Sequence, residues 1–189
     1  MATIAAASKH TGEDIGGETA EGFPPVARRD ARILVLGSLP GQRSIAEQQY
    51  YAHPRNAFWP IMKALFGVQG SYQDRLLQLV GTRIALWDVL QSSIRPGSLD
   101  GSIKLDSARA NDFETFLRAH ADIRLIAFNG KKAEQLFARF VTGNAIGHGI
   151  RRTGLPSTSP AYAAMPFSGK LALWRRAMAA VSDRQITGS

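Results

Sequence analysis

Short runs of apolar residues, separated by stretches with helical periodicity, are the feature that most constrains the fold of this chain. Three runs are clear, at Ile33–Leu36, Ile84–Trp87 and Ile123–Phe128, and a weaker fourth lies near Gly149–Leu155. Runs that are apolar at nearly every position are typical of strands buried on both faces, as in a parallel sheet covered by helices. The runs therefore predict a short, mostly parallel sheet of four strands.

The segments between the runs carry apolar residues at helical spacing. They are Phe58–Phe66, Tyr72–Val80, Ala108–His120, Lys131–Phe140 and Leu171–Val181. Strands that alternate with helices predict the α/β class, with helices on both faces of the sheet. Ligands of such sheets bind beyond the carboxyl ends of the strands, so the function is expected in the loops at residues 37–55, 88–103, 129–130 and 156–166.

The chain is expected to divide into a polar tail and one folded domain. Residues 1–30 are rich in Ala, Gly, Glu and Thr and lack apolar periodicity, which predicts a disordered tail. Residues 31–189 are expected to form a single domain, because about 100–200 residues is a typical domain length. The sequence has neither an apolar run of about 18 residues nor a secretory leader, so we expect a cytoplasmic protein without a membrane anchor.

The charge balance and the absence of cysteine narrow the function. Without cysteine, disulfides, thiolate metal sites and a cysteine nucleophile are excluded. The net charge is +8, and because the first thirty residues hold three basic and five acidic side chains, residues 31–189 carry +10. A folded part this basic favours nucleic acid as a partner, with a merely soluble basic surface as the alternative.

The loop after the first apolar run is rich in glycine and reads Gly37-Ser38-Leu39-Pro40-Gly41-Gln42-Arg43-Ser44. Two glycines and a proline directly after a strand predict a tight turn whose backbone N–H groups can approach a ligand closely. The Gly-Lys-Ser/Thr of a P-loop does not follow. An ordinary connection from strand to loop is the alternative.

The same loop continues with a mixture of rings and polar groups, Tyr50-Tyr51-Ala52-His53-Pro54-Arg55-Asn56-Ala57-Phe58-Trp59. The amide of Asn56 offers a donor and an acceptor in one plane, which match the edge of a nucleobase. An aromatic ring nearby can stack on the face of the base. Alternatively, Asn56 caps the following helix while Phe58 faces the core. Trp59 is expected in the core in either case.

The fourth loop carries consecutive hydroxyl groups between prolines, in Leu155-Pro156-Ser157-Thr158-Ser159-Pro160-Ala161-Tyr162. Hydroxyl and backbone N–H groups of such turns bind phosphate oxygens and fix the register of a protein on DNA. A solvated connection is the alternative.

The three segments GSLPGQRS, YYAHPRNAFW and LPSTSPA, in this order, resemble the uracil-DNA glycosylase superfamily. Within it they are most similar to the hypoxanthine-DNA (deoxyinosine) glycosylases, or family six. ALWDVLQSS, RPGSLDGSI and IAFNGKKAEQLF add further matches, and the resemblance covers about residues 31–181. It implies a three-layer α/β/α sandwich and a DNA repair enzyme. Such an enzyme flips a deaminated base, uracil or hypoxanthine, out of DNA and hydrolyses its N-glycosidic bond, leaving an abasic site.

The resemblance also implies roles for single residues. Asn56 falls on the base-recognising, catalytically required Asn of the family, and Phe58 on the ring that stacks on the flipped base. Ser157 and Ser159 fall in the motif that pinches the DNA backbone. The other residues expected to bind the base are Gly37, Ser38, Leu39, Tyr51 and Ser157. Those expected to bind DNA are Pro40, Gly41, Gln42, Ser44, His53, Arg55, Ser157, Thr158, Ser159, Ala161 and Tyr162.

Three positions depart from the wider superfamily. Other branches carry a water-activating Asp or Asn where Leu39 stands, and the uracil-specific branch carries a His where Ser157 stands. The hypoxanthine branch shares both losses. Tyr162 stands where close relatives are expected to have Asn. Because Ala161 is too small to fill the gap left by a flipped base, Tyr162 is the candidate wedge into the duplex.

The chemistry is expected to need no cofactor or metal. The three motifs contain no lysine, so a Schiff base and a lyase step are not expected, and the enzyme is interpreted as a monofunctional, monomeric glycosylase. His53 is expected to position its loop or contact phosphate, with proton transfer as the alternative. Asp88 and Asp100 are interpreted as turn and cap residues.

The sequence also suggests how thymine is rejected, and it leaves two other functions open. The bulk of Tyr51 or Tyr50 is the candidate that excludes the methyl group of thymine. A protein that binds damaged or abasic DNA without efficient turnover is one competing function. An enzyme of free nucleosides is another, although it would not need so basic a surface.

Overall fold

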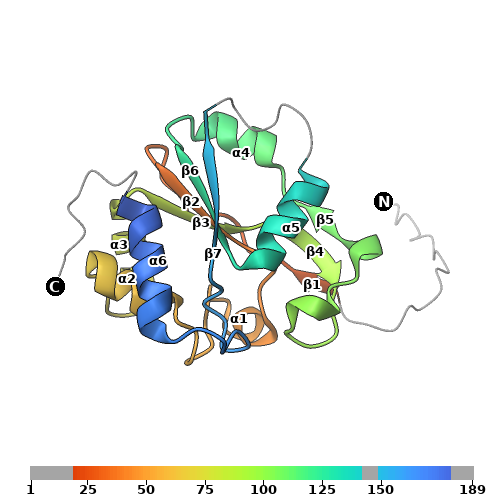
Figure 1. The fold of residues 1–189 in the computed structure, drawn as a ribbon. Helices are drawn as coiled ribbons and strands as arrows, with labels where there is room; N and C mark the ends of the chain where they lie inside the picture. The colour runs from red at the N-terminus through yellow and green to blue at the C-terminus, as the bar shows by residue number, and fades with distance from the viewer. Residues whose placement is uncertain (1–18, 142–148, 180–189) are drawn as a thin grey trace, which may run out of the picture.

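A sheet of four parallel strands forms the centre of the molecule in the computed structural model, which describes residues 19–141 and 149–179. The strand order is β3-β2-β6-β7 (Figure 1). These strands are β2 (Ile33–Gly37), β3 (Ile84–Asp88), β6 (Leu125–Asn129) and β7 (Arg151–Leu155). Each predicted run therefore forms a strand, and because all pairings are parallel, the four strands end at the same edge of the sheet.

Helices cover both faces of this sheet, which confirms the predicted three-layer α/β fold (Figure 1). One face carries α2 (Phe58–Phe66), α3 (Tyr72–Gly81) and α6 (Phe167–Ala179), and the other carries α4 (Phe113–Ala119) and α5 (Lys131–Phe140). A short helix, α1 (Gln42–Glu47), follows β2. The last two residues of the predicted helix at 171–181 lie outside the described residues. None of the helices in the described ranges has the length and apolarity to cross a membrane.

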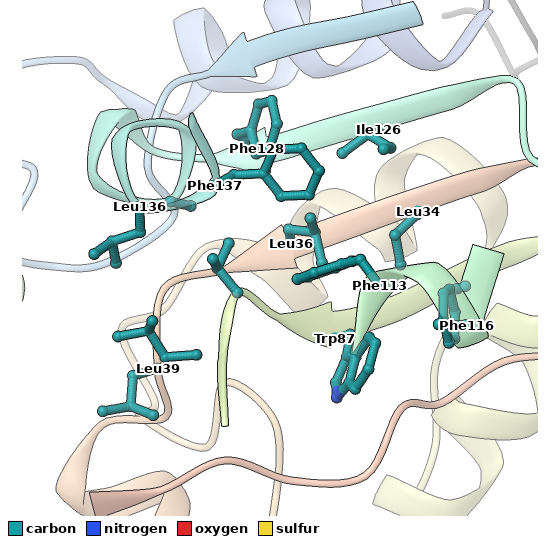
Figure 2. Packing of buried hydrophobic residues seen from close by; sticks show 14 of the residues in the cluster. Leu34, Leu36, Leu39, Trp87, Phe113, Phe116, Ile126, Phe128, Leu136 and Phe137 are labelled. Carbon is teal, nitrogen blue, oxygen red and sulfur yellow. The ribbon is translucent and has the colours of Figure 1, made fainter. Parts of the chain in front are cut away.

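Alternate side chains of each central strand enter two separate hydrophobic cores. On β2, Leu34 and Leu36 pack towards α4 and α5 (Figure 2), whereas Ile33 and Val35 pack towards α2 and α6. Trp59 lies in the second of these cores, as expected. Burial on both faces explains why the strands are apolar at nearly every position.

A second, antiparallel sheet lies beside the first and was not predicted. Its strands, in the order β1-β4-β5, are β1 (Thr19–Glu21), β4 (Leu90–Ile94) and β5 (Arg109–Ala110). Two 3₁₀ turns, η1 (Asp100–Ser102) and η2 (Leu105–Ser107), connect β4 to β5. The helix predicted from residue 108 begins only at Phe113, because Asp112 caps it by accepting a hydrogen bond from the Thr115 N–H group at 3.0 Å.

The predicted tail boundary at residue 30 falls too late, because residues 19–30 pack on the domain. Strand β1 pairs with β4, and Val26 forms a bridge with Leu86. The carbonyl oxygen of Phe23 accepts a hydrogen bond from Trp87 Nε1 at 3.0 Å. These contacts join segments far apart in the sequence, so local composition does not reveal them. The rest of the predicted tail, residues 1–18, lies outside the described residues.

Candidate active site

An open pocket of about 480 Å³ lies beyond the carboxyl ends of β2, β3 and β6. The last residues of these strands, Gly37, Asp88 and Asn129, line the pocket together with the loops that follow β2 and β7. The predicted site residues that line it are Gly37, Ser38, Leu39, Pro40, Gly41, Ser44, Tyr51, His53, Asn56, Ser157, Thr158, Ser159, Ala161 and Tyr162. Three others, Gln42, Arg55 and Phe58, do not line it.

The amide of Asn56 is held in one orientation by the backbone that follows it. Its Oδ1 atom accepts a hydrogen bond from the Phe58 N–H group at 3.0 Å, at the start of α2. An N–H donor identifies the amide oxygen, because an NH₂ group cannot accept this hydrogen bond. The NH₂ group of Asn56 is therefore the half of the amide left as a donor for a ligand. The side chain supports the first turn of α2 and also presents a polar group to the pocket.

Tyr51 lines the pocket, as do Tyr50 and Tyr162, whereas Phe58, to which the resemblance assigns base stacking, does not. Phe58 has no exposed surface, and its ring lies behind that of Tyr51, with ring centroids 4.3 Å apart. Tyr51 has a φ of 56°, a left-handed backbone conformation that a non-glycine residue rarely adopts. The buried ring of Phe58 therefore supports Tyr51 from the core, and the stacking of a base on either ring stays a prediction.

The loop after β7 is fastened to the end of β6 by Asn129. Asn129 Nδ2 donates to Thr158 Oγ1, and Asn129 Oδ1 accepts from the Thr158 N–H group, both at 2.8 Å. The Thr158 carbonyl oxygen also accepts from the Ala57 N–H group at 2.9 Å. Thr158 is only 1% exposed. Its hydroxyl therefore anchors the loop, and the DNA contact that the sequence predicts for Thr158 stays a prediction.

The hydroxyl groups of Ser157 and Ser159 lie at the pocket. Ser157 Oγ accepts from the Ser159 N–H group and Ser159 Oγ from the Ala161 N–H group, each at 3.2 Å. A hydroxyl that accepts a hydrogen bond can still donate its own hydrogen. Both serines thus keep the donor that a contact to a phosphate oxygen requires.

Tyr162 stands at the rim of the pocket with 38% of its surface exposed. Lys170 of α6 fixes this residue, because its Nζ atom donates to the Tyr162 carbonyl oxygen at 2.8 Å and lies 5.1 Å from the centroid of the ring. Lys170 itself is buried. The ring is therefore held at the rim, and its role as a wedge stays a prediction.

Arg95 is a buried cation that the sequence analysis does not single out. Its guanidinium donates from Nη1 to the Leu39 carbonyl oxygen at 3.1 Å and from Nη2 to the Pro40 carbonyl oxygen. These bonds tie the turn after β2 to the chain after β4. In the sequence, an arginine before Pro and Gly is indistinguishable from a solvated surface residue.

Two hydroxyl groups predicted to contact the base or DNA are engaged within the protein. Ser38 Oγ donates to Asp100 Oδ1, and Ser44 Oγ accepts from the Ala52 N–H group at 3.3 Å. Both serines are buried. Their side chains therefore hold the loops of the pocket together.

The ring of His53 is oriented by its neighbour. His53 Nδ1 accepts from the Arg55 N–H group at 3.1 Å. In the neutral ring the hydrogen must then be on Nε2, which makes that atom a donor. This contact favours the loop-positioning or phosphate-binding role over proton abstraction.

Comparison with known proteins identifies the family of this chain. The sequence model of the Uracil DNA glycosylase superfamily matches residues 24–180. The chain belongs to the uracil DNA glycosylase superfamily. It is accordingly a DNA glycosylase, an enzyme of DNA repair that hydrolyses N-glycosyl bonds.

Relatives of this glycosylase include two proteins named hypoxanthine DNA glycosylase. The one from Methanosarcina barkeri is 41% identical over 116 residues, which are 60% of this chain and 72% of the relative. The one from Methanosarcina acetivorans is 41% identical over 115 residues, 59% of this chain and 72% of the relative. A solution NMR structure from Methanosarcina acetivorans, described as a candidate uracil DNA glycosylase, is 35% identical with a TM-score of 0.67. The match covers 84% of this chain and 98% of that one.

The floor of the glycosylase pocket holds a carboxyl group that the sequence analysis interprets as a turn residue. Asp88 ends β3 and is 3% exposed, and its Oδ2 atom has no hydrogen-bond partner among the described residues. Burial and then the negative charge of Asp100 raise the pKa of Asp88 from 3.8 to about 7, against the opposing effect of Arg95. The only signal in the sequence is its place at the end of a buried strand, where the function of such sheets lies.

Leu39 cannot take part in acid–base chemistry in this glycosylase. The residue lines the pocket, but its side chain is 5% exposed and packs with the hydrophobic core (Figure 2). The position that activates water in other branches is therefore apolar here, as the sequence indicates. In the described part of the chain, no three His, Asp or Glu side chains are grouped so as to hold a metal ion.

Proposed function

We propose that this glycosylase removes hypoxanthine from DNA. The observation that carries the proposal is the fixed amide of Asn56, a pocket residue whose NH₂ group is left as a donor. Hypoxanthine has the acceptor O6 at the position where adenine has an amino group. A fixed donor can therefore form a hydrogen bond with hypoxanthine, whereas it would face another donor in adenine. The names of the two Methanosarcina relatives support the same substrate.

The same amide supplies transition-state stabilisation. As the N-glycosidic bond breaks, negative charge accumulates on the leaving base, and the hydrogen bond from Asn56 to O6 strengthens with it. One preorganised donor of this kind contributes about 3–4 kcal/mol. Water then adds to the sugar and leaves an abasic site. Flipping the base into the pocket, with Tyr162 filling the gap, belongs to this proposal.

Uracil is a second candidate substrate because its O4 is also an acceptor. Tyr51 and Tyr50 both line the pocket, and one of these rings is the candidate barrier to the methyl group of thymine. Guanine shares O6 with hypoxanthine, so its rejection has to rest on its 2-amino group. The proposed partner is DNA that contains hypoxanthine or uracil, with the abasic strand as product, and we expect a monomer acting in the cytoplasm.

A strand-cleavage assay tests the proposal. End-labelled duplexes that differ only at one position, which holds hypoxanthine, uracil, adenine or guanine, are incubated with excess protein. They are then treated with alkali, which cuts only at abasic sites. We expect cleavage at hypoxanthine and none at adenine or guanine. Tight binding of the hypoxanthine duplex without cleavage would instead identify a DNA-binding protein without turnover. Release of base from free deoxyinosine but not from the duplex would identify a nucleoside enzyme.

A further inference from the structure

The floor of the pocket is built around the carboxyl group of Asp88. This group lies against Gly37 of the neighbouring strand, so closely that a Cβ atom at Gly37 would collide with Asp88 Oδ1. Its Oδ2 atom is buried, and no hydrogen-bond partner for it exists among the residues that the structure describes. A buried carboxylate without a partner is strongly disfavoured, whereas the neutral acid carries an O–H donor ready for a ligand.

The charged and titratable groups around Asp88 come from three segments. Asp100 of η1, which accepts from Ser38, adds a negative charge, and Arg95 after β4 opposes it. Arg95 is committed to the carbonyl oxygens of the turn after β2. Tyr50 and Tyr51, which precede α2, stay protonated because burial and then the charge of Asp88 raise their pKa values. The surroundings as a whole favour the neutral form of the carboxyl.

We propose that Asp88 is a catalytic acid, which donates its proton to a ring nitrogen of the departing hypoxanthine. The Hoogsteen edge of hypoxanthine carries two adjacent acceptors, O6 and N7. The pocket supplies two donors for them, the NH₂ group of Asn56 and the protonated carboxyl of Asp88. This role rests on the proposed function, because it presumes that a purine base enters the pocket.

The proton balance of the step is closed. The bond between sugar C1′ and base N9 breaks, and its electron pair passes into the ring system of the base. The Asp88 proton is transferred to N7, so that hypoxanthine leaves as the neutral molecule. The oxygen of water bonds to C1′, and the proton that it releases restores the acid form of Asp88. The products are an abasic site and free hypoxanthine, and no other reactant is consumed.

The test compares single-turnover rates of the wild type, Asp88→Asn and Asp100→Asn on a hypoxanthine duplex between pH 5.5 and 9. We expect the wild-type rate to fall as pH rises through about 7, because the acid form of Asp88 is lost. Asp88→Asn keeps the shape of the side chain but has no transferable proton. We expect it to be at least about tenfold slower at pH 6, with a flat pH profile. Asp100→Asn removes a neighbouring negative charge, so the fall should move to lower pH.

Asp106→Asn is the matched control, because Asp106 is exposed in η2 and does not line the pocket. It should leave the rate and the pH profile unchanged, and melting temperatures verify that all variants fold. A wild-type rate that rises through pH 7, or an Asp88→Asn variant with the rate and pH profile of the wild type, would overturn the assignment.

A carboxyl titration separates the failure of this inference from the failure of the proposed function. The ¹³C resonance of the Asp88 carboxyl, assigned by its loss in Asp88→Asn, should titrate near pH 7 in the wild type. If hypoxanthine is not released by the wild type, the proposed function fails whatever this resonance does. If hypoxanthine is released but the resonance titrates near pH 4, the acid role of Asp88 fails alone.

Discussion

Asn56 performs two tasks with the two halves of one amide, and two substitutions separate them. Asn56→Ala removes both the NH₂ donor and the acceptor of the Phe58 N–H group. Asn56→Asp keeps the acceptor and removes the donor. We expect both variants to lose about 10²–10³-fold in the single-turnover rate on hypoxanthine duplexes. Only the Ala variant should also lose stability, by about 1 kcal/mol. More than about a tenth of the wild-type rate in either variant would remove Asn56 from catalysis.

Asp88 links stability to pH, with a sign that follows from its pKa. The pKa is about 7 in the folded protein against the ordinary 3.8, so between these values the folded state binds the proton and the unfolded state does not. The free energy of unfolding therefore falls as pH rises from about 4 to 7, by about 4 kcal/mol in total. Asp88→Asn should remove this loss. Its melting temperature relative to the wild type should be higher at pH 8 than at pH 5, and an equal difference at both pH values would contradict the prediction.

Residues of the site could be predicted from the sequence where their position in a loop after a strand was enough to place them at the pocket. Asn56, Ser157 and Ser159 lie in loops that follow strands, and the sheet topology alone directs those loops to one edge. For Phe58 the sequence left two outcomes open, stacking on a base or packing in the core, and the structure shows the second, with Phe58 fully buried. The burial of Asp88 depends on Gly37, a neighbour from another strand.

At the scale of elements, the sequence predicted what is locally encoded and missed what depends on distant pairing. Helices α2 and α5 have the predicted bounds, because their apolar faces and their ends are visible in the sequence itself. Strand β4 has the sequence Leu-Gln-Ser-Ser-Ile, and it is a strand because β1 and β5 pair with it. The local sequence of β4 does not indicate those partners.

Strand β1 makes a testable contribution through these long-range pairings. A chain that begins at residue 31 lacks β1, the Val26 bridge and the acceptor of the Trp87 indole N–H group. We expect its melting temperature to fall by at least about 4 °C, which corresponds to roughly 1 kcal/mol or more. A chain that begins at residue 19 keeps all three features and is the matched control. Equal melting temperatures for the two truncations would show that β1 adds no stability.

The loop that carries Tyr162 is expected to matter more for excision from double-stranded DNA than from single-stranded DNA. Tyr162→Ala removes the ring that fills the vacated stack, so excision should slow more on a duplex than on a single strand that contains hypoxanthine. Lys170→Met is the companion variant, because it removes the cation that holds Tyr162 and leaves the ring in place. It should show a weaker loss of the same kind. Equal losses on both substrates, with a lower melting temperature, would mean that Tyr162 only packs against its loop.

At the scale of the whole molecule, the parallel sheet and its three layers were predictable from the alternation of apolar runs and helical segments. The carboxyl edge as the site followed from that topology. What the sequence could not show is the shape of the pocket, since residues from several separate loops line it. The net positive charge was visible in the composition, but the composition does not show which face of the molecule binds DNA.

That charge predicts a steep dependence of DNA affinity on salt. A basic protein releases counterions when it binds, with a slope in log K against log salt of about −0.9 for each phosphate neutralised. We expect a slope steeper than about −3, measured by fluorescence anisotropy. Arg55→Gln changes an exposed predicted contact and should reduce the slope by about one. Arg118→Gln, in the Glu114 ion pair on α4, should not change it. A flat plot would contradict a site that tracks phosphates.

The hydrogen bonds between Asn129 and Thr158 also decide when the chain loses conformational entropy. Fixing the backbone of one residue costs about 1–2 kcal/mol, and a loop that became ordered only on contact with DNA would add that cost to every binding event. Here Asn129, the Ala57 N–H group and Lys170 already hold the segment from Pro156 to Tyr162 in the free protein. Its ordering is complete once the chain has folded. The entropy change on binding should therefore reflect the counterions and water that leave the interface, and very little of it the loop itself.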